Sequence, residues 1–479
     1  MPPLPRQTGA YRMSREDAVA SAYAYFDEGH FLEDLKRRVA IPSESQKHNS
    51  RPSLDQYLNE EMIPAFSAMG HDCQVFENPV EGKGPVLLAT RMEDVSLPTV
   101  LGYGHGDVIR GLEDQWDEGL NPWVAQQRGE KLYGRGTADN KGQHTVNMIA
   151  LARILETRGN LGFNSKFMIE MGEENGSPGL DVIISNNLDA FSANVFVASD
   201  GPRVEPHRPT IFLGARGCRN FDLVLECRKG GHHSGNWGGI LANPGVILAH
   251  AISTIVSPNG QILIKDWLPP PISNSTRQAL AGIIVSGGSD APEIDLNWGE
   301  PGLTPAEQVY AWNSFEVLTF KTGNPERPVN AVPPRAKANC QVRFVAGTDR
   351  NNLLPALRLH LDKNGFETVK IQTAPPENAI DFAAAATSPD DPWAAWASAS
   401  MEKTTGIPTA VLPSLGGSIC NDLFNVTLGL PTIWIPHSYA ACSQHAPNEH
   451  ILLPQFREAL GIMAGLYWDL GEPDAPKAM

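Results

Sequence analysis

The chain has 479 residues, of which 41% are hydrophobic and 19% are charged, and its formal net charge is −16. A chain of this length predicts more than one hydrophobic core, and therefore two domains. The negative charge, with no run of Lys or Arg, argues against binding to nucleic acid or to anionic membranes, although a small anionic substrate held by local arginines remains compatible with it.

The cysteines and the apolar stretches of the sequence indicate the cellular compartment of the protein. The six cysteines form no Cys-x-x-Cys pair, which is typical of free thiols in a reducing environment. The N-terminal region has no apolar core of signal-peptide length, and no apolar stretch reaches about 18 residues. We therefore expect a soluble, cytoplasmic protein in which residues 1–12 form a loose tail.

Along the first 200 residues, short apolar runs alternate with helical patterns. Ser14 is a candidate N-cap for the first helix, and helical spacing follows a Gly-rich loop at 131–142. Alternation of strands and helices predicts a layered α/β sheet. The buried strands are expected at 86–92, 99–105, 165–174 and 194–201.

The pattern changes after residue 207 and returns after residue 375. Residues 210–227 and 335–347 alternate apolar and polar positions, which favours an antiparallel, half-exposed sheet. A buried strand at 432–436 and a terminal helix after residue 453 then resemble the first pattern. We predict a discontinuous catalytic domain (1–207 and 375–479) with an inserted α+β lid and dimerisation domain (208–374).

Metal-ligand side chains follow the predicted buried strands. A lone aspartate at a strand end is more often a helix cap, and two adjacent glutamates are usually a solvated turn. Ligands of open α/β sheets, however, bind beyond the carboxyl ends of the strands, and clustered carboxylates repel one another unless a cation lies between them. The candidates are His105, Asp107, Asp139, Glu173, Glu174, Asp200 and His445.

Residue types suggest how two metal ions would be held. Two ions about 3.5–4 Å apart need a bridging carboxylate, and Asp139 on its Gly-rich loop suits that role. One ion would then bind His105 and Asp200, and the other would bind Glu174 and His445. Two imidazoles and three carboxylates form a set that zinc, cobalt or manganese accepts.

Two acidic residues are left for other roles. Asp107, two residues after His105, is better placed to orient the imidazole through its other nitrogen than to bind the second ion. Glu173 would face the metal-activated water, and a carboxylate in that position is a general base.

Several motifs occur in a specific order, namely His-Gly-Asp (105–107), Gly-Arg-Gly-Thr-Ala-Asp-Asn-Lys-Gly (134–142), Gly-Glu-Glu-Asn-Gly-Ser (172–177), Ser-Asp-Gly (199–201) and a distant His445. This order resembles the dizinc metallopeptidase family of aminoacylases, acetylornithine and succinyl-diaminopimelate deacylases, and carnosinases. The resemblance runs from about residue 30 to 470, and segments 214–217, 232–244 and 329–347 look most like the carnosinase branch.

The resemblance implies a mixed-sheet, zinc-exopeptidase-like catalytic domain and further site residues. Glu173 matches the general acid/base. The lid histidine that reaches into the partner's site matches His233, with His232 as an alternative. A histidine that acts in the partner's site implies a homodimer. The lid Asn and Arg that hold the substrate carboxylate match Asn330 and Arg343. The Gly-Gly-Ser turn that lines the substrate pocket matches Gly416, Gly417 and Ser418.

The expected activity is hydrolysis of a C–N amide bond in a small carboxylate-bearing substrate, a dipeptide or an N-acyl amino acid. Two divalent ions per subunit, zinc foremost, would activate the water. Other amides, such as a carbamate or an aryl amide, remain alternatives on the same site. A non-catalytic binding homologue is a further alternative, against which the presence of Glu173 argues.

Overall fold

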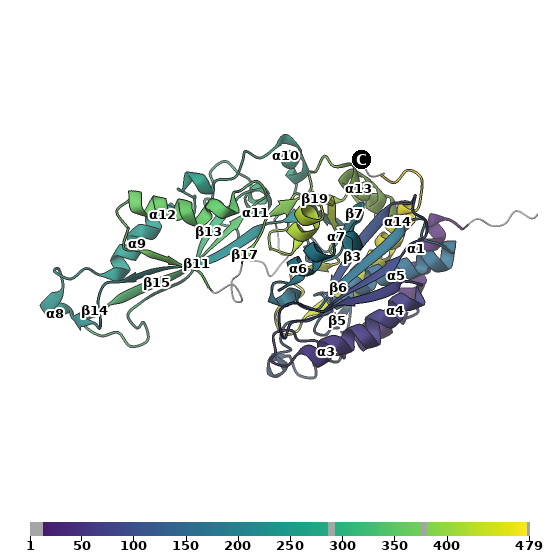
Figure 1. Ribbon diagram of the computed structural model, residues 1–479, viewed down its shortest axis with the longest axis horizontal. Helices are drawn as coiled ribbons and strands as arrows, with labels where there is room; N and C mark the ends of the chain where they lie inside the picture. The colour runs from purple at the N-terminus through teal and green to yellow at the C-terminus, as the bar shows by residue number, and fades with distance from the viewer. Residues whose placement is uncertain (1–12, 286–292, 375–380, 477–479) are drawn as a thin grey trace, which may run out of the picture.

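The computed structural model describes residues 13–285, 293–374 and 381–476, so the tail predicted at residues 1–12 lies outside the described residues. Two large sheets organise the described residues (Figure 1). All six cysteines are free thiols, as predicted. Within the described ranges, no helix is both long enough and apolar enough to cross a membrane.

The larger sheet is mixed, with eight strands among the described residues. β3 pairs in parallel with β6 and β7, and β20 pairs in parallel with β7, whereas β1 and β2 run antiparallel to their neighbours. This confirms the predicted α/β class. Across the sheet, the strands are β1 (Asp72–Phe76), β2 (Val86–Arg91), β6 (Asn164–Glu170), β3 (Thr99–His105), β7 (Val195–Ala198), β20 (Thr432–Trp434), β9 (Thr210–Phe212) and β19 (Ala410–Leu412).

Both faces of this sheet are buried, because its strands send alternate side chains into two cores. Leu87 and Ala89 of β2 belong to one core, and Val86 and Leu88 belong to the other. Such burial on both faces explains the nearly continuous apolar runs in the sequence. The α-helices that contribute to the first core are α1 (Arg15–Asp27), α2 (His30–Val39), α3 (Arg51–Gln56), α4 (Ile63–Ala68), α5 (Lys141–Arg158), α13 (Pro392–Thr405) and α14 (Leu453–Leu470). Those that contribute to the second core are α6 (Leu180–Asn186), α7 (Leu188–Phe191), α10 (Asn274–Leu280) and α11 (Pro305–Ala311).

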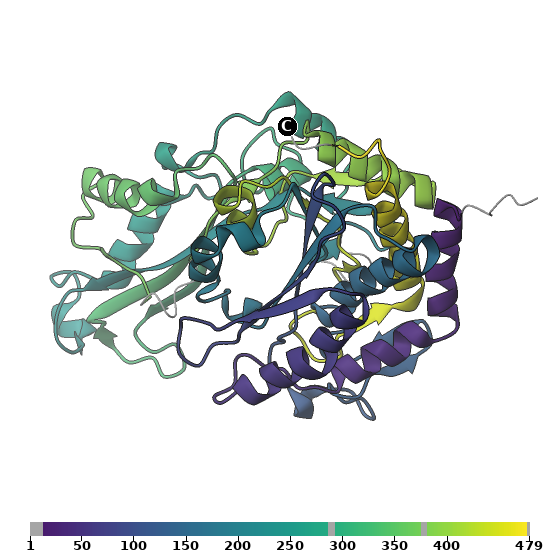
Figure 2. The ribbon, with the colours of Figure 1, turned by 45° about the vertical axis from the view of Figure 1, so that its right-hand side comes forward.

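The two ends of the described chain pack together. Helix α1, in purple, lies beside α14, in yellow, in both views (Figures 1 and 2). Arg15 donates to the Asp469 carboxylate at 2.9 Å across this contact. Ser14 caps α1 by accepting from the Asp17 N–H, so the predicted helix start is confirmed.

The smaller sheet lies to one side of the molecule in both views and has its own core. β15 alternates exposed or half-buried residues with buried ones, as the sequence predicts for a sheet with one covered face. The covering helices are α9 (Pro244–Ile255) and α12 (Leu353–Lys363). The strands, in order, are β13 (Ser314–Thr322), β15 (Arg335–Phe344), β11 (Gly217–Glu226) and β16 (Lys370–Gln372), with β17 (Asp381–Phe382) also paired to β11.

Residues 210–212 differ from the expectation. Their apolar run was expected to belong to the antiparallel sheet, but β9 is fully buried and pairs in parallel with β19 in the larger sheet. The expectation was wrong because the alternating pattern begins only at Gly217, where β11 starts.

Candidate metal centre

Polar side chains gather at the carboxyl ends of three neighbouring parallel strands. His105 is the last residue of β3, and Asp200 follows β7 by two residues. Glu173 and Glu174 open the short helix η3 (Glu173–Asn175), which follows β6. Since β3 is parallel to both β6 and β7, these side chains reach the same edge of the sheet.

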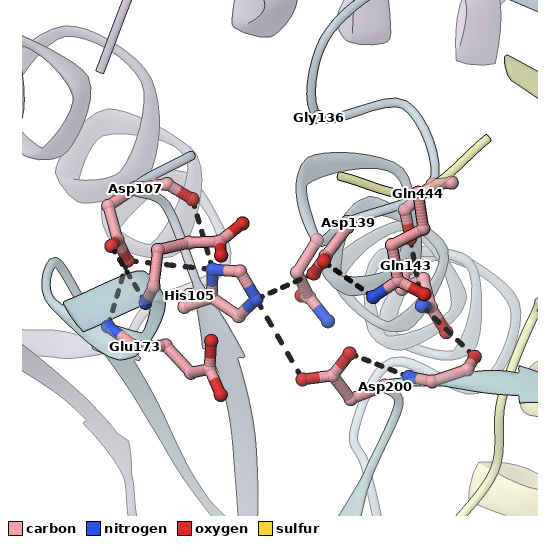
Figure 3. Close-up of polar contacts among 12 residues, drawn as sticks. His105, Asp107, Gly136, Asp139, Gln143, Glu173, Asp200 and Gln444 are labelled. Atoms are coloured by element: carbon pink, nitrogen blue, oxygen red, sulfur yellow. Dashed lines mark hydrogen bonds and ion pairs between the residues drawn. The ribbon is translucent and has the colours of Figure 1, made fainter. Parts of the chain in front are cut away.

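A first group of possible ligands comprises His105, Asp139 and Asp200, which are all buried and offer atoms within 4.8 Å of one another. His105 Nε2 lies 2.9 Å from Asp139 Oδ1 and 3.8 Å from Asp200 Oδ2 (Figure 3). One imidazole nitrogen and two carboxylates therefore point to a common position.

A second group shares Asp139 with the first and adds Glu174 and His445. His445 Nε2 lies 2.9 Å from Asp139 Oδ2 and 3.1 Å from Glu174 Oε2. Gln444 Nε2 also donates to Asp139 Oδ2 at 2.6 Å. Asp139 thus directs one carboxylate oxygen toward each group, which is the arrangement that a bridging ligand requires.

Asp107 connects His105 to the glutamate turn. The Nδ1 of His105 donates to the Asp107 carbonyl at 3.0 Å and lies 3.5 Å from its carboxylate, which leaves Nε2 directed at the first group. The Asp107 carboxylate accepts from the backbone N–H groups of Glu173 and Glu174, each at 3.2 Å. The side chain of Glu173 extends from this turn toward the space between His105 and Asp200 (Figure 3).

Burial and mutual repulsion work against ionisation of these carboxylates. Burial, reinforced by the charge of Asp139, raises the pKa of Glu174 to about 7 and that of Asp200 to about 6. Burial also raises the pKa of Glu173 well above its usual value. Divalent cations between the carboxylates would remove this penalty, and the donors are the nitrogen and oxygen ligands that zinc, cobalt and manganese accept. The residues present therefore fit a dinuclear metal centre.

A buried glutamate supports the loop that carries Asp139. Glu449 Oε1 accepts from the backbone N–H groups of Gly136, Ala138 and Asp139, at 2.9–3.1 Å, and Arg135 pairs with Oε2 at 2.7 Å. Gly136 adopts φ 87°, a conformation that favours glycine. The position of Glu449, four residues after His445, is the signal in the sequence that points to this supporting role.

Two predicted lid residues lie far from this centre within one chain. His233 and Asn330 meet beside the paired strands β12 (His232–His233) and β14 (Ala331–Val332), where the Ser234 N–H donates to the Asn330 carbonyl at 2.8 Å. Helix α8 (Ser234–Trp237) and β14 occupy the left tip of the molecule, opposite β3 and β6 (Figure 1). His232 lies on the same short strand, so the two histidines share this location.

The other predicted substrate-binding residues lie near the centre. Arg343 Nη1 donates to Ser418 Oγ at 3.0 Å, and the Ser418 hydroxyl donates to the Arg216 carbonyl at 2.6 Å. Arg216 in turn donates through Nε and Nη2 to the Gly416 carbonyl. Residues 416–418 line a cavity of about 600 Å³ together with Asp139, Glu173, Asp200 and His445.

Known proteins with related sequences include two curated dipeptidases. The human Beta-Ala-His dipeptidase is 37% identical over 264 residues, and the Cys-Gly metallodipeptidase DUG1 of Candida albicans is 31% identical over 253 residues. The alignments cover 51% and 49% of this chain, respectively, and 51% of each relative, so the chain matches about half the length of either relative.

The fold has a solved counterpart. The M20 family metallo-carboxypeptidase Sso-CP2 from Sulfolobus solfataricus superposes with a TM-score of 0.76 at 23% identity, covering 92% of this chain and 99% of that one. Residues 101–469, well over half of the chain, match the profile described as Peptidase family M20/M25/M40. The chain therefore belongs to this peptidase family.

Proposed function

We propose that the chain is a metal-dependent hydrolase that cleaves the C–N amide bond of a small carboxylate-bearing substrate, a dipeptide or an N-acyl amino acid. The observation that supports this most strongly is the pair of ligand groups that share Asp139, with Glu173 beside them. The names of the two curated relatives favour a dipeptide over the alternatives, a carbamate or an aryl amide.

Two divalent ions, zinc in preference to cobalt or manganese, would be held by these groups. His105 and Asp200 would bind one ion, Glu174 and His445 the other, and Asp139 both. When bound, the ions would supply Lewis acidity toward the substrate carbonyl and lower the pKa of a water molecule.

The chain's own residues would carry the proton and hold the substrate. Glu173 accepts a proton from the attacking water as its oxygen bonds to the carbonyl carbon, and returns it to the nitrogen as the C–N bond breaks. Asp107 keeps His105 oriented through Nδ1. Arg343 would bind the substrate carboxylate, and the turn at 416–418 would line the substrate pocket, both in the chain that carries the ligand groups.

His233 and Asn330 would act from the partner subunit of a homodimer, with His233 donating to the carbonyl oxygen. Their location at the far tip of their own chain supports action in trans. The edge strand β13 exposes Val317, Leu318 and Phe320, at 38%, 49% and 43%, and such an apolar edge favours pairing with a second copy.

We also retain the division into a catalytic domain (1–207 and 375–479) and an inserted lid (208–374). The separate core of the smaller sheet, built from residues between 221 and 369, supports it, with β9 at the boundary. The six free cysteines favour a reducing compartment, the cytoplasm.

Metal analysis combined with one variant tests the function. We expect the purified protein, reconstituted with zinc, to hold close to two ions per chain and to hydrolyse dipeptides. Glu173→Gln should keep the metal content and lose at least about a hundredfold in turnover, as loss of a general base predicts. Metal content near zero would favour the binding-homologue alternative, and full activity of Glu173→Gln would refute the assigned role.

A further inference from the structure

One wall of the cavity at the candidate metal centre is apolar. It is formed by side chains from four separate parts of the chain, which line the same cavity as Glu173 and His445. We call it the apolar wall, and its residues are Val204, Phe212, Val309, Tyr310, Leu415 and Ile419.

The apolar wall begins directly beside a candidate metal ligand. A Cβ atom placed on Gly201, the neighbour of Asp200, would lie 3.3 Å from Leu415 Cδ1. A Cβ on Gly416 would lie 3.1 Å from Val309 Cγ1 and 3.9 Å from Tyr310 Cε1. Leu415 and Gly416, neighbours in the chain, therefore link the Asp200 position to helix α11 (Pro305–Ala311), on which Val309 and Tyr310 lie.

The apolar wall is part of the packed core and not a set of loose surface groups. Phe212 and Ile419 are buried members of the second core, and Tyr310 and Leu415 pack against that core. Arg203 also lines the cavity, but its guanidinium donates to the Glu458 carboxylate at 2.6 Å. Arg216 Nη2 also lies near the wall, 3.9 Å from a Cβ placed on Gly416, but it donates to the Gly416 carbonyl. A charged substrate group against the apolar side chains of the wall would lose its hydration, and both arginines already have partners.

We propose that this enzyme selects substrates with a bulky apolar side chain, such as that of leucine or phenylalanine, on a residue next to the cleaved amide bond. The inference rests on the proposed function and adds the class of side chain that the site accepts. An amide carbonyl at the metal centre places the neighbouring side chain within reach of the wall, because Leu415 lies beside Gly201 and Asp200.

The test uses the full-length protein reconstituted with zinc and two dipeptide series, Gly-X and X-Gly, with X as Gly, Ala, Leu, Phe, Asp or Lys. In at least one series, we expect kcat/KM to be about tenfold or more higher for Leu or Phe than for Gly, and lowest for Asp and Lys. Val309→Asp should lower the ratio of kcat/KM for the Leu substrate to kcat/KM for the Gly substrate by about tenfold or more. Val309→Thr, which keeps the shape of the side chain, should lower the ratio less.

The matched control introduces an aspartate in place of a valine at a position that does not line the cavity. Val95 is 97% exposed, and Val95→Asp should leave the ratio unchanged. Three results would overturn the inference while the proposed function stands. They are hydrolysis that does not depend on X, a preference for charged X, or a ratio of kcat/KM values for Leu and Gly substrates that is unchanged in folded Val309→Asp and Val309→Thr. Failure of the zinc-loaded protein to hydrolyse any peptide would overturn both.

Discussion

Glu449 accepts a hydrogen bond from the backbone N–H of Asp139 at 3.1 Å, with Glu449 1% exposed and Asp139 4% exposed. The same oxygen accepts from Gly136 and Ala138, so one carboxylate fixes the whole loop that presents Asp139 to both ligand groups. Its other oxygen is paired with Arg135. The position of the shared ligand thus depends on Glu449, a residue that belongs to neither ligand group.

Glu449→Gln should weaken metal binding without removing a ligand. The amide offers one acceptor oxygen in place of two and cannot neutralise the buried Arg135, so we expect a loss of stability of roughly 3–5 kcal/mol and a metal affinity reduced about 10–100-fold. Denaturant unfolding and zinc titration measure the two effects. Glu156→Gln removes an exposed ion pair with Arg153 and should change stability by less than about 0.5 kcal/mol. Wild-type zinc affinity in Glu449→Gln would contradict the supporting role.

Asp107→Asn tests whether the orientation of His105 matters. The Asn amide has one acceptor oxygen, so it cannot accept from both N–H groups of the glutamate turn as the carboxylate does. The substitution also removes the negative charge that faces His105 Nδ1. We expect zinc affinity to fall about 10–100-fold, with little change in the folded structure. Asp390→Asn, at an exposed position, should bind zinc as the wild type does, and equal affinities in the two variants would count against the assignment.

The pH dependence of stability should reverse between the metal-free and metal-bound protein. Burial raises the pKa of Glu174 to about 7 and that of Asp200 to about 6, so both contribute less stability as pH rises from about 4 through these values. Hydrogen bonds to Asp139 and Glu174 raise the pKa of His445 to about 11, so its contribution is present below about 6.5 and is lost as pH rises further.

Metal binding requires the deprotonated forms of the same groups. The difference in melting temperature between the zinc-bound and metal-free protein should therefore widen between pH 5 and 8. Calorimetry of both forms across this range measures it. A constant difference would show that these carboxylates do not change protonation when zinc binds.

Part of the site follows from the sequence because strand ends are local features. His105, Glu173 and Asp200 each follow a buried apolar run, and parallel pairing brings such ends to one edge of a sheet. The His445 loop comes from a distant part of the chain. It follows the predicted strand at 432–436, and its order relative to the other motifs agreed with a place in the same site. The apolar wall left no such signal, because single residues from several segments build it.

The lid residues show where sequence reasoning stops. Asn330 and Arg343 were expected together as a clamp for the substrate carboxylate, yet Arg343 contacts Ser418 and Asn330 lies beside Ser234. The ten-residue strand β15 accounts for this difference, because it extends from the tip that holds Asn330 to the end that carries Arg343. Spacing in sequence does not show that the strand is straight and long enough to separate them.

This separation leads to the final prediction, for which subunits of two variants are mixed. Glu173→Gln and His233→Ala homodimers should each be nearly inactive. In a random mixture, half of the dimers pair the two variants, and each such dimer has one site with intact Glu173 and His233, so about a quarter of wild-type activity should return. If His233 acted within its own chain, no site would be complete and no activity would return. Substituting His232→Ala for His233→Ala distinguishes the neighbouring histidines, since only the residue that acts in trans gives an inactive homodimer that mixing rescues.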